Sequence, residues 1–148
     1  MSEELNVSVL MFIAYRSAEN RIIDAVRSAG YTDFTVAQAR IAARIGPNGT
    51  RLSDLAEQAQ VAKQTATVLV DRLERAGYVE RAPDPTDARA RLVRIAARGA
   101  ELIPIARAEE ARIEAEWTEH LGRRRMSQLR EALTALREIT DPYQTSSA

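Results

Sequence analysis

The spacing of apolar residues changes abruptly at Gly77, and this change restricts the folds that the chain can adopt. Over residues 62–76, apolar side chains recur every three or four positions, which is the period of an α-helix. Residues 78–81 and 90–95 instead alternate between apolar and polar side chains, as strands do. The segment 82–89 between them contains two prolines and two aspartates, and it predicts a loop. A β-hairpin is therefore expected directly after a helix.

A second short helix precedes this one, and the pair predicts a helix-turn-helix. Thr50 is expected to cap a helix over residues 51–59, which a short turn joins to the helix over 62–76. Further upstream, Thr35 and Gln38 have the spacing of a capping box that opens a helix reaching about residue 45. A helix-turn-helix followed by a hairpin is the arrangement of a winged helix.

Long helical patterns lie on both sides of this region. Helices are predicted over residues 4–29, 100–121 and 124–139, with Gly122 separating the last two. The fold class is thus mainly α: a winged helix-turn-helix with a two-stranded β wing and long terminal dimerisation helices. We expect one structural domain, in which residues 1–30 and 100–148 form the helical dimerisation region and residues 31–99 form the winged helix-turn-helix DNA-binding region.

The terminal helices carry more apolar residues than one small winged helix can cover. A symmetric homodimer would supply the missing partner surface. The alternative is that these residues pack within one subunit. The residues concerned are Leu5, Val9, Phe12, Leu129, Leu133 and Leu136.

Composition excludes several classes of function. The chain has no cysteine and one histidine, so we predict no disulfide, no metal site and no cofactor. No apolar run approaches the roughly 20 residues of a membrane span, and the first ten residues do not resemble a signal peptide, so a cytoplasmic location is expected. The one carboxylate cluster lacks a glycine-rich loop or an activated nucleophile, which favours a solvated acidic face and argues against an enzyme. Its members are Glu109, Glu110, Glu114, Glu116 and Glu119.

The formal net charge is zero, but the charges are unevenly distributed. Residues 61–94 contain seven basic and five acidic residues, whereas residues 101–121 contain two basic and six acidic residues. A basic segment beside an acidic one is typical of a DNA-binding module on an acidic scaffold, although a solvated charged face has the same pattern.

Several short motifs follow one another in the middle of the chain: 51–56, 63–67, 70–79, the wing 84–89, 92–93 and Gly99. Together they resemble the MarR family of winged helix-turn-helix transcription regulators, and the resemblance covers nearly the whole chain. It implies a homodimer that binds double-stranded DNA at a pseudo-palindromic operator, more often as a repressor, and that a small-molecule effector can release. The alternative is a winged-helix protein-interaction module without DNA binding.

The helix over 62–76 would enter the major groove with its N-terminal turn against the bases. Lys63 and Gln64 can reach base edges or phosphates, and Thr65 and Thr67 can offer a hydroxyl or a methyl group. Further along, Arg72 can contact a phosphate or form a salt bridge with a helix neighbour such as Glu74.

The wing contains the pattern Asp-x-Arg at Asp87 and Arg89. The resemblance implies that Arg89 enters the minor groove, where a narrow, negative groove favours arginine. It also implies that Asp87 orients basic side chains of the wing, and Arg91 can support them at a phosphate. The alternative is a solvated turn with a surface ion pair worth about 0–1 kcal/mol.

The chain departs from the family pattern at two helix starts. Ala62 and Ala96 stand where the family usually has a hydroxyl residue that caps the following helix. Losing a cap costs about 1 kcal/mol, and the first turn of the recognition helix also loses a phosphate contact.

The resemblance further implies a site for a small aromatic acid or phenol between the dimerisation helices and the winged helix. Phe12, Tyr15, Arg16 and Trp117 are the candidates, and the alternative is that they are ordinary core or surface residues. A ligand there would act by changing the separation of the two recognition helices.

Overall fold

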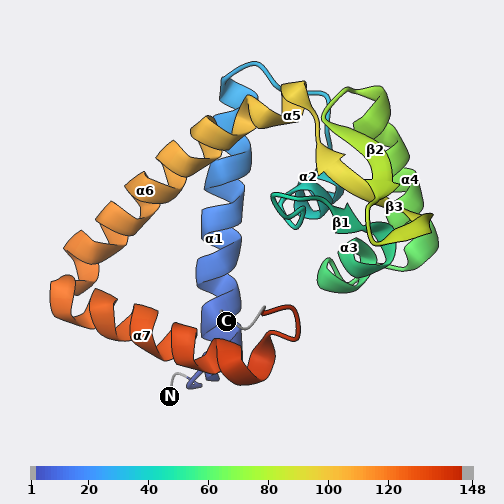
Figure 1. Cartoon of the computed structure of the whole chain (residues 1–148). Helices are drawn as coiled ribbons and strands as arrows, with labels where there is room; N and C mark the ends of the chain where they lie inside the picture. The colour runs from blue at the N-terminus through green and yellow to red at the C-terminus, as the bar shows by residue number, and fades with distance from the viewer. Residues whose placement is uncertain (1–2, 145–148) are drawn as a thin grey trace. The chain divides into compact units, whose positions relative to one another are not determined.

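The computed structural model describes residues 3–144, and its elements follow the predicted order (Figure 1). The described residues form two compact units, one up to Glu109 and one from Glu110. The fold is mainly α with a small antiparallel sheet, as predicted. The elements are α1 Val7–Ser28, α2 Val36–Ala42, β1 Thr50–Arg51, α3 Leu52–Gln58, α4 Lys63–Arg75, β2 Val79–Asp84, β3 Asp87–Ile95, α5 Ala97–Ala100, α6 Leu102–Leu121 and α7 Arg123–Thr140.

The winged helix of the first unit is built on one apolar core. Helices α2, α3 and α4 pack against the sheet around this core (Figure 1). The helical spacing predicted for the apolar residues of α4 is confirmed, because four of its five apolar residues, Ala66, Leu69, Val70 and Leu73, are buried as a stripe on one face. Burial of this stripe fixes which face of α4 points to solvent. The core residues are Ile41, Leu55, Ala56, Ala66, Leu69, Val70, Leu73, Tyr78, Val79 and Val93.

The sheet has a third strand that the sequence did not predict. Its order is β1-β3-β2, with Thr50 opposite Val93 and Arg51 opposite Leu92. The prediction that Thr50 caps a helix starting at Arg51 was therefore wrong. The Thr50 hydroxyl accepts a hydrogen bond from the Gly46 amide at 2.9 Å, and α3 begins at Leu52 without a side-chain cap.

The predicted loop over residues 82–89 was also wrong, because most of it belongs to the strands of the wing. β2 continues through Pro83 to Asp84, and β3 begins at Asp87, so two residues connect them. Proline disrupts a strand through its missing N–H group. β2 lies at the edge of the sheet, however, and an edge strand tolerates a proline whose N–H side faces away from the ladder.

Capping and close packing set the remaining helix limits. α1 begins at Val7 and not at Glu4, because the Asn6 side chain accepts a hydrogen bond from the Val9 amide at 2.9 Å. The capping box of α2 is present as predicted, although this helix ends at Ala42.

The helix predicted over residues 100–121 corresponds to α6, which begins at Leu102, and the short helix α5 precedes it from Ala97 to Ala100. α5 lies so close to the start of β2 that a Cβ on Gly99 would stand 2.2 Å from the Tyr78 carbonyl oxygen. Only glycine fits at this position.

The first unit contains a buried carboxylate that was expected to be solvated. Glu109 is buried and accepts hydrogen bonds from Arg21 of α1, with its Oε1 at 3.2 Å from Nε and 3.0 Å from Nη2. A buried carboxylate requires such a partner. The prediction that Glu109 lies on a solvated acidic face was therefore wrong. Its bonds to Arg21 join α6 to α1.

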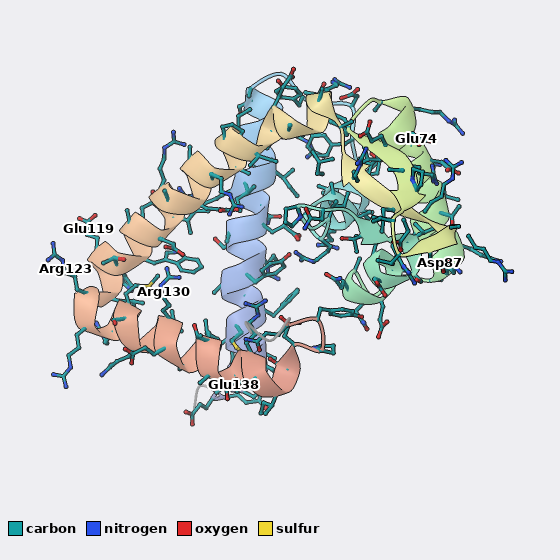
Figure 2. The ribbon with its side chains drawn as sticks, in the orientation of Figure 1. Glu74, Asp87, Glu119, Arg123, Arg130 and Glu138 are labelled. Atoms are coloured by element: carbon teal, nitrogen blue, oxygen red, sulfur yellow. The ribbon has the colours of Figure 1, made fainter. Side chains whose placement is uncertain are left out.

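In the second unit, α7 carries an apolar stripe but has no buried residue among those described. Gly122 separates it from α6 with a φ of +85°, as predicted from the glycine. Arg130 of α7 (Figure 2) is ion-paired with Glu114 of α6 at 2.7 Å. Between residues 3 and 144, no helix combines the length and the apolarity needed to cross a membrane.

Candidate nucleic-acid interface

The outward face of α4 carries most of the predicted groove-facing residues. Lys63, Gln64 and Thr65 have exposed side chains in the first turn. The helix starts after Ala62 without a side-chain cap, as the departure from the family pattern predicted. Thr67 is half-buried, and its hydroxyl donates to the Lys63 carbonyl oxygen at 3.0 Å. Of the four residues, Thr67 is thus the least available to a ligand.

Arg72 does not form the salt bridge with Glu74 that the sequence left open. Glu74, at the C-terminal end of α4 (Figure 2), instead accepts a hydrogen bond from Arg81 of β2 at 2.8 Å. Arg81 also contacts Asp71 at 2.8 Å. Among residues 3–144, Arg72 and Arg75 have no acidic partner within 4.0 Å, and both are exposed.

Arg81 joins the wing to the recognition helix. Its side chain is about four-fifths buried, and its guanidinium group bridges two carboxylates that are three residues apart on α4. A planar guanidinium group that binds two carboxylates resists rotation of one element against the other. One indication of this link was present in the sequence: Arg81 lies in a predicted strand that directly follows the helix with Asp71 and Glu74.

The tip of the wing is held by Asp84, which the sequence did not single out. Its carboxylate is buried and accepts from the Thr86 amide at 2.8 Å and the Thr86 hydroxyl at 2.7 Å. Arg51 donates to the same carboxylate from Nε at 2.8 Å and Nη2 at 2.7 Å. The bonds from Thr86 and then Arg51 lower the pKa of Asp84. The turn at Pro85 and Thr86 is thereby tied to the main body of the winged helix.

Arg89 lies in a bulge of β3. Pro83 is opposite Arg91 and Asp84 is opposite Asp87, so residues 88–90 lie opposite no residue of β2. A bulge of this kind redirects the side chains it contains. Asp87, on the wing (Figure 2), accepts a hydrogen bond from the Arg89 amide at 3.0 Å. Asp87 therefore binds the backbone at Arg89, and the surface ion pair considered from the sequence is not formed between these two residues.

Internal ion pairs occupy most of the acids around α4 and the wing. Asp71, Glu74, Glu80 and Asp84 are all paired with arginines. On α4 and the hairpin, as described, Asp87 is the one acid without an ion pair. Five exposed basic residues also have none: Lys63, Arg72, Arg75, Arg89 and Arg91. This surface is therefore basic although the whole chain is neutral.

A polar cluster joins α5 to Asp33 and to the residues between α4 and β2. Arg98 of α5 contacts Asp33 through Nη1 at 2.7 Å and Nη2 at 3.0 Å, and it donates to the Ala76 carbonyl oxygen at 2.6 Å. Its guanidinium carbon lies 4.3 Å from the centre of the Tyr78 ring, and the Tyr78 hydroxyl donates to Asp33. The bonds from Arg98 and then Tyr78 lower the pKa of Asp33 to about 2. Burial, and then the bond to Asp33, raises the pKa of Tyr78 to about 12.

Three of the four candidate effector residues lie on α1. Phe12 is exposed, and the Arg16 guanidinium carbon lies 5.5 Å from the centre of its ring. The Tyr15 hydroxyl donates to Glu19 at 2.8 Å and accepts from Arg44 at 2.9 Å. Trp117 is half-buried and belongs to the second unit.

The polar network around Tyr15 was not predicted. Arg40 of α2 donates to Glu19 from Nε at 3.0 Å and Nη2 at 2.8 Å, and these bonds lower the pKa of Glu19. Glu19 lies 21 positions before Arg40, and Tyr15 lies 29 positions before Arg44, so no local pattern marks these contacts. The network joins α1 to α2 and the residues just after it.

Known proteins resemble the chain over almost its full length. The transcriptional regulator Tm0710 from Thermotoga maritima is 30% identical, with 89% of this chain and 91% of that chain covered and a TM-score of 0.59. A MarR structure is 27% identical, with 90% and 96% covered and a TM-score of 0.71. NadR in complex with 4-hydroxyphenylacetate is 26% identical, with 92% and 95% covered and a TM-score of 0.68.

The family assignment agrees with the fold and with the basic surface. Residues 32–90, which span α2 through the tip of the wing, match the MarR family model. No curated protein matches the chain. The winged helix, the sequence match within it and the similarity to solved regulators lead to one conclusion: the chain belongs to the MarR family of transcription regulators.

Proposed function

We propose that the chain is a homodimeric repressor that binds a pseudo-palindromic DNA operator. The observation that carries this proposal is the set of five exposed basic side chains on α4 and the wing that have no acidic partner among the described residues. Phosphates would neutralise these charges, and the release of counterions from DNA would drive binding.

In this proposal α4 lies in the major groove. Lys63, Gln64 and Thr65 of its first turn approach base edges or phosphates, and Arg72 binds the phosphate backbone. Thr67 contributes less, because its hydroxyl is bonded to the helix backbone. The uncapped first turn of α4 also leaves backbone N–H groups that a phosphate can satisfy.

The wing reaches the adjacent minor groove through Arg89, and Arg91 binds a neighbouring phosphate. The bulge at residues 88–90 and the Asp87 bond to the Arg89 amide support this role, because they give the tip a defined shape. Arginine in a narrow minor groove gains from the strong negative potential there.

A homodimer is proposed from the apolar surface that a single chain leaves exposed. α7 has no buried residue although it carries an apolar stripe, and Ile139 is 83% exposed. In this proposal residues 1–30 and 100–148 form the dimerisation region, and residues 31–99 form the DNA-binding region. Two recognition helices would then meet half-sites roughly 10 base pairs apart. The exposed apolar residues are Leu5, Val7, Val9, Leu10, Met11, Phe12, Ile13, Leu129, Leu133, Leu136 and Ile139.

Selection from a random pool of duplexes tests DNA binding directly. The purified chain should enrich a two-fold symmetric sequence, and fluorescence anisotropy should then give an affinity that falls steeply with salt. Five bases in each of two subunits would give a slope of log K against log salt of up to about −9. A winged-helix module that binds only protein would enrich no sequence. A reporter gene behind the selected operator distinguishes repression from activation.

A small aromatic acid is the proposed effector, with Phe12, Tyr15, Arg16 and Trp117 as candidate contacts. The exposed Phe12 ring and the adjacent Arg16 guanidinium group support it, because together they offer an apolar face and a positive charge to an aromatic carboxylate. 4-Hydroxyphenylacetate, which NadR binds, is a suitable first probe. It should weaken operator binding by the wild type and act less on Arg16→Ala.

We also propose that the chain works in the cytoplasm, because a repressor must be where its operator is.

A further inference from the structure

Val68 stands out on the recognition helix because it is a large apolar side chain that points into solvent. It is 47% exposed, and among residues 31–99 no other large apolar side chain is exposed. The other apolar side chains of α4 are buried on the opposite face. Solvent contact is unfavourable for a valine side chain, so Val68 would gain from contact with an apolar group of a bound partner.

The neighbours of Val68 on this face are polar or charged. Gln64 lies one turn before it and Arg72 one turn after it, at the i−4 and i+4 positions, and both are exposed. Valine has no hydrogen-bonding group and one strongly preferred χ1 rotamer in a helix. Val68 is therefore a rigid apolar contact between a group that can read a base edge and a group that can bind a phosphate.

The major groove offers one apolar feature to such a side chain, the C5-methyl group of thymine. We propose that Val68 contacts the C5-methyl group of one thymine in each half-site and sets the preference for thymine at that position. This inference rests on the proposed function, because it requires α4 to lie in the major groove.

Deoxyuridine provides the direct test, because it differs from thymidine in the base only by the missing C5-methyl group. The full-length chain would be measured by fluorescence anisotropy on the selected operator and on duplexes in which each thymine in turn is replaced by deoxyuridine. For the wild type, each half-site should contain one thymine whose single replacement weakens binding about fourfold, the factor expected for one buried methyl group. Val68→Ala should weaken binding to the thymine duplex and should not distinguish thymine from deoxyuridine at that position.

The control is Ile103→Ala, which removes an equally exposed apolar side chain from α6. This variant should distinguish thymine from deoxyuridine as the wild type does. Val68→Ala should also retain its helical circular dichroism, because Val68 is not part of the core. A second variant, Val68→Thr, keeps one methyl group and should retain part of the discrimination.

The possible outcomes separate the two proposals. If Val68→Ala still distinguishes thymine from deoxyuridine at every position at which the wild type does, the role of Val68 is refuted while DNA binding stands. If wild-type discrimination is found nowhere, the same conclusion follows. If the wild type enriches no duplex at all, both this inference and the proposed function are overturned.

Discussion

Two aspartates stabilise the fold by binding side chains from segments that are far apart in the sequence. Asp33 binds Arg98 and Tyr78, which lie 65 and 45 residues away. Asp84 holds Arg51 and the turn residue Thr86 at the same time. These carboxylates are ionised in the folded protein and lose their bonds when protonated, so the stability of the fold depends on pH.

Asp33→Asn should reduce the loss of stability in acid. The pKa of Asp33 is lowered from 3.8 to about 2, so its contribution to the free energy of unfolding is complete above about pH 3.8 and is lost as the pH falls through about 2. Denaturant unfolding between about pH 5 and pH 2 should therefore show a shallower pH dependence in the variant. Tyr78→Phe should keep most of the wild-type dependence, because the bond from Arg98 is the larger cause. Equal slopes in Asp33→Asn and the wild type would contradict this assignment.

Arg89→Ala should lower operator affinity at least about tenfold and leave the dimer folded. The reason is the loss of a charged side chain from the minor groove, where each good contact is worth about 1–3 kcal/mol. Arg94→Ala is a matched control, because Arg94 lies on the same strand but is ion-paired with Glu80 at 3.0 Å. Anisotropy on the selected operator measures both. Unchanged affinity in Arg89→Ala would remove the wing from the interface.

Lys63→Ala should weaken DNA binding and flatten its salt dependence. Each phosphate contact contributes about 0.9 to the slope of log K against log salt, so the dimer should lose about 2 from the slope. The same anisotropy titration at several salt concentrations gives this number. An unaltered slope would mean that Lys63 contacts no phosphate.

At the scale of secondary structure, the wing is a rigid extension of the core and not a mobile loop. Arg81 links β2 to α4, Arg51 links the start of α3 to the tip of the wing, and β1 adds a third strand on the other side of β3. Gly99 lets α5 pack against the start of β2. The position of Arg89 relative to α4 is therefore determined by packing within the winged helix.

Gly99→Ala should destabilise the fold by about 3 kcal/mol, at the upper end for overpacking of a core. The added Cβ would stand 2.2 Å from the Tyr78 carbonyl oxygen, and backbone atoms cannot move aside as a flexible side chain can. Gly46→Ala is the control, because the nearest atom to its Cβ would be the Thr50 hydroxyl oxygen at 3.5 Å, an ordinary contact. Chemical denaturation measures both. Similar stabilities for the two variants would contradict the packing argument.

For the whole molecule, the apolar surface of the terminal helices points to a second copy. In the described part of the chain, α7 has no buried residue, and the N-terminal half of α1 also leaves its large apolar side chains exposed. In the proposed dimer this surface becomes the interface, and the two basic surfaces bind one operator together.

Leu133→Glu should convert the dimer into a folded monomer, because a buried, unpaired carboxylate at an interface is unfavourable. Leu133 is exposed in the single chain, so the winged helix keeps its core. Sedimentation velocity gives the mass, and circular dichroism reports the helices. Val68→Glu places the same charge on an exposed apolar residue outside the proposed interface and should remain dimeric. A dimeric Leu133→Glu would exclude this stretch of α7 from the interface.

Sequence patterns correctly predicted the features of the fold that a few neighbouring residues determine. The capping box at Thr35 and Gln38, the buried stripe of α4 and the glycine end of α6 were all confirmed. Predictions failed where a partner strand decides the structure. Thr50 and Arg51 are too short a segment to show a strand period, and Pro83 lies in a strand because β2 is at an edge.

The sequence by itself determined the family, the order of the elements and the face of α4 that points to solvent, because helical period, capping and turn residues act over a few positions. Only the tertiary structure decided which acids the arginines bind, where the bulge of the wing lies and that Arg81 and Asp84 hold it. The ion pairs of Arg81, Arg51 and Arg98 join side chains 7 to 65 positions apart, which meet only when the core has formed. The surface of α4 and the wing is basic although the chain has no net charge, because five exposed bases there have no acidic partner among the described residues.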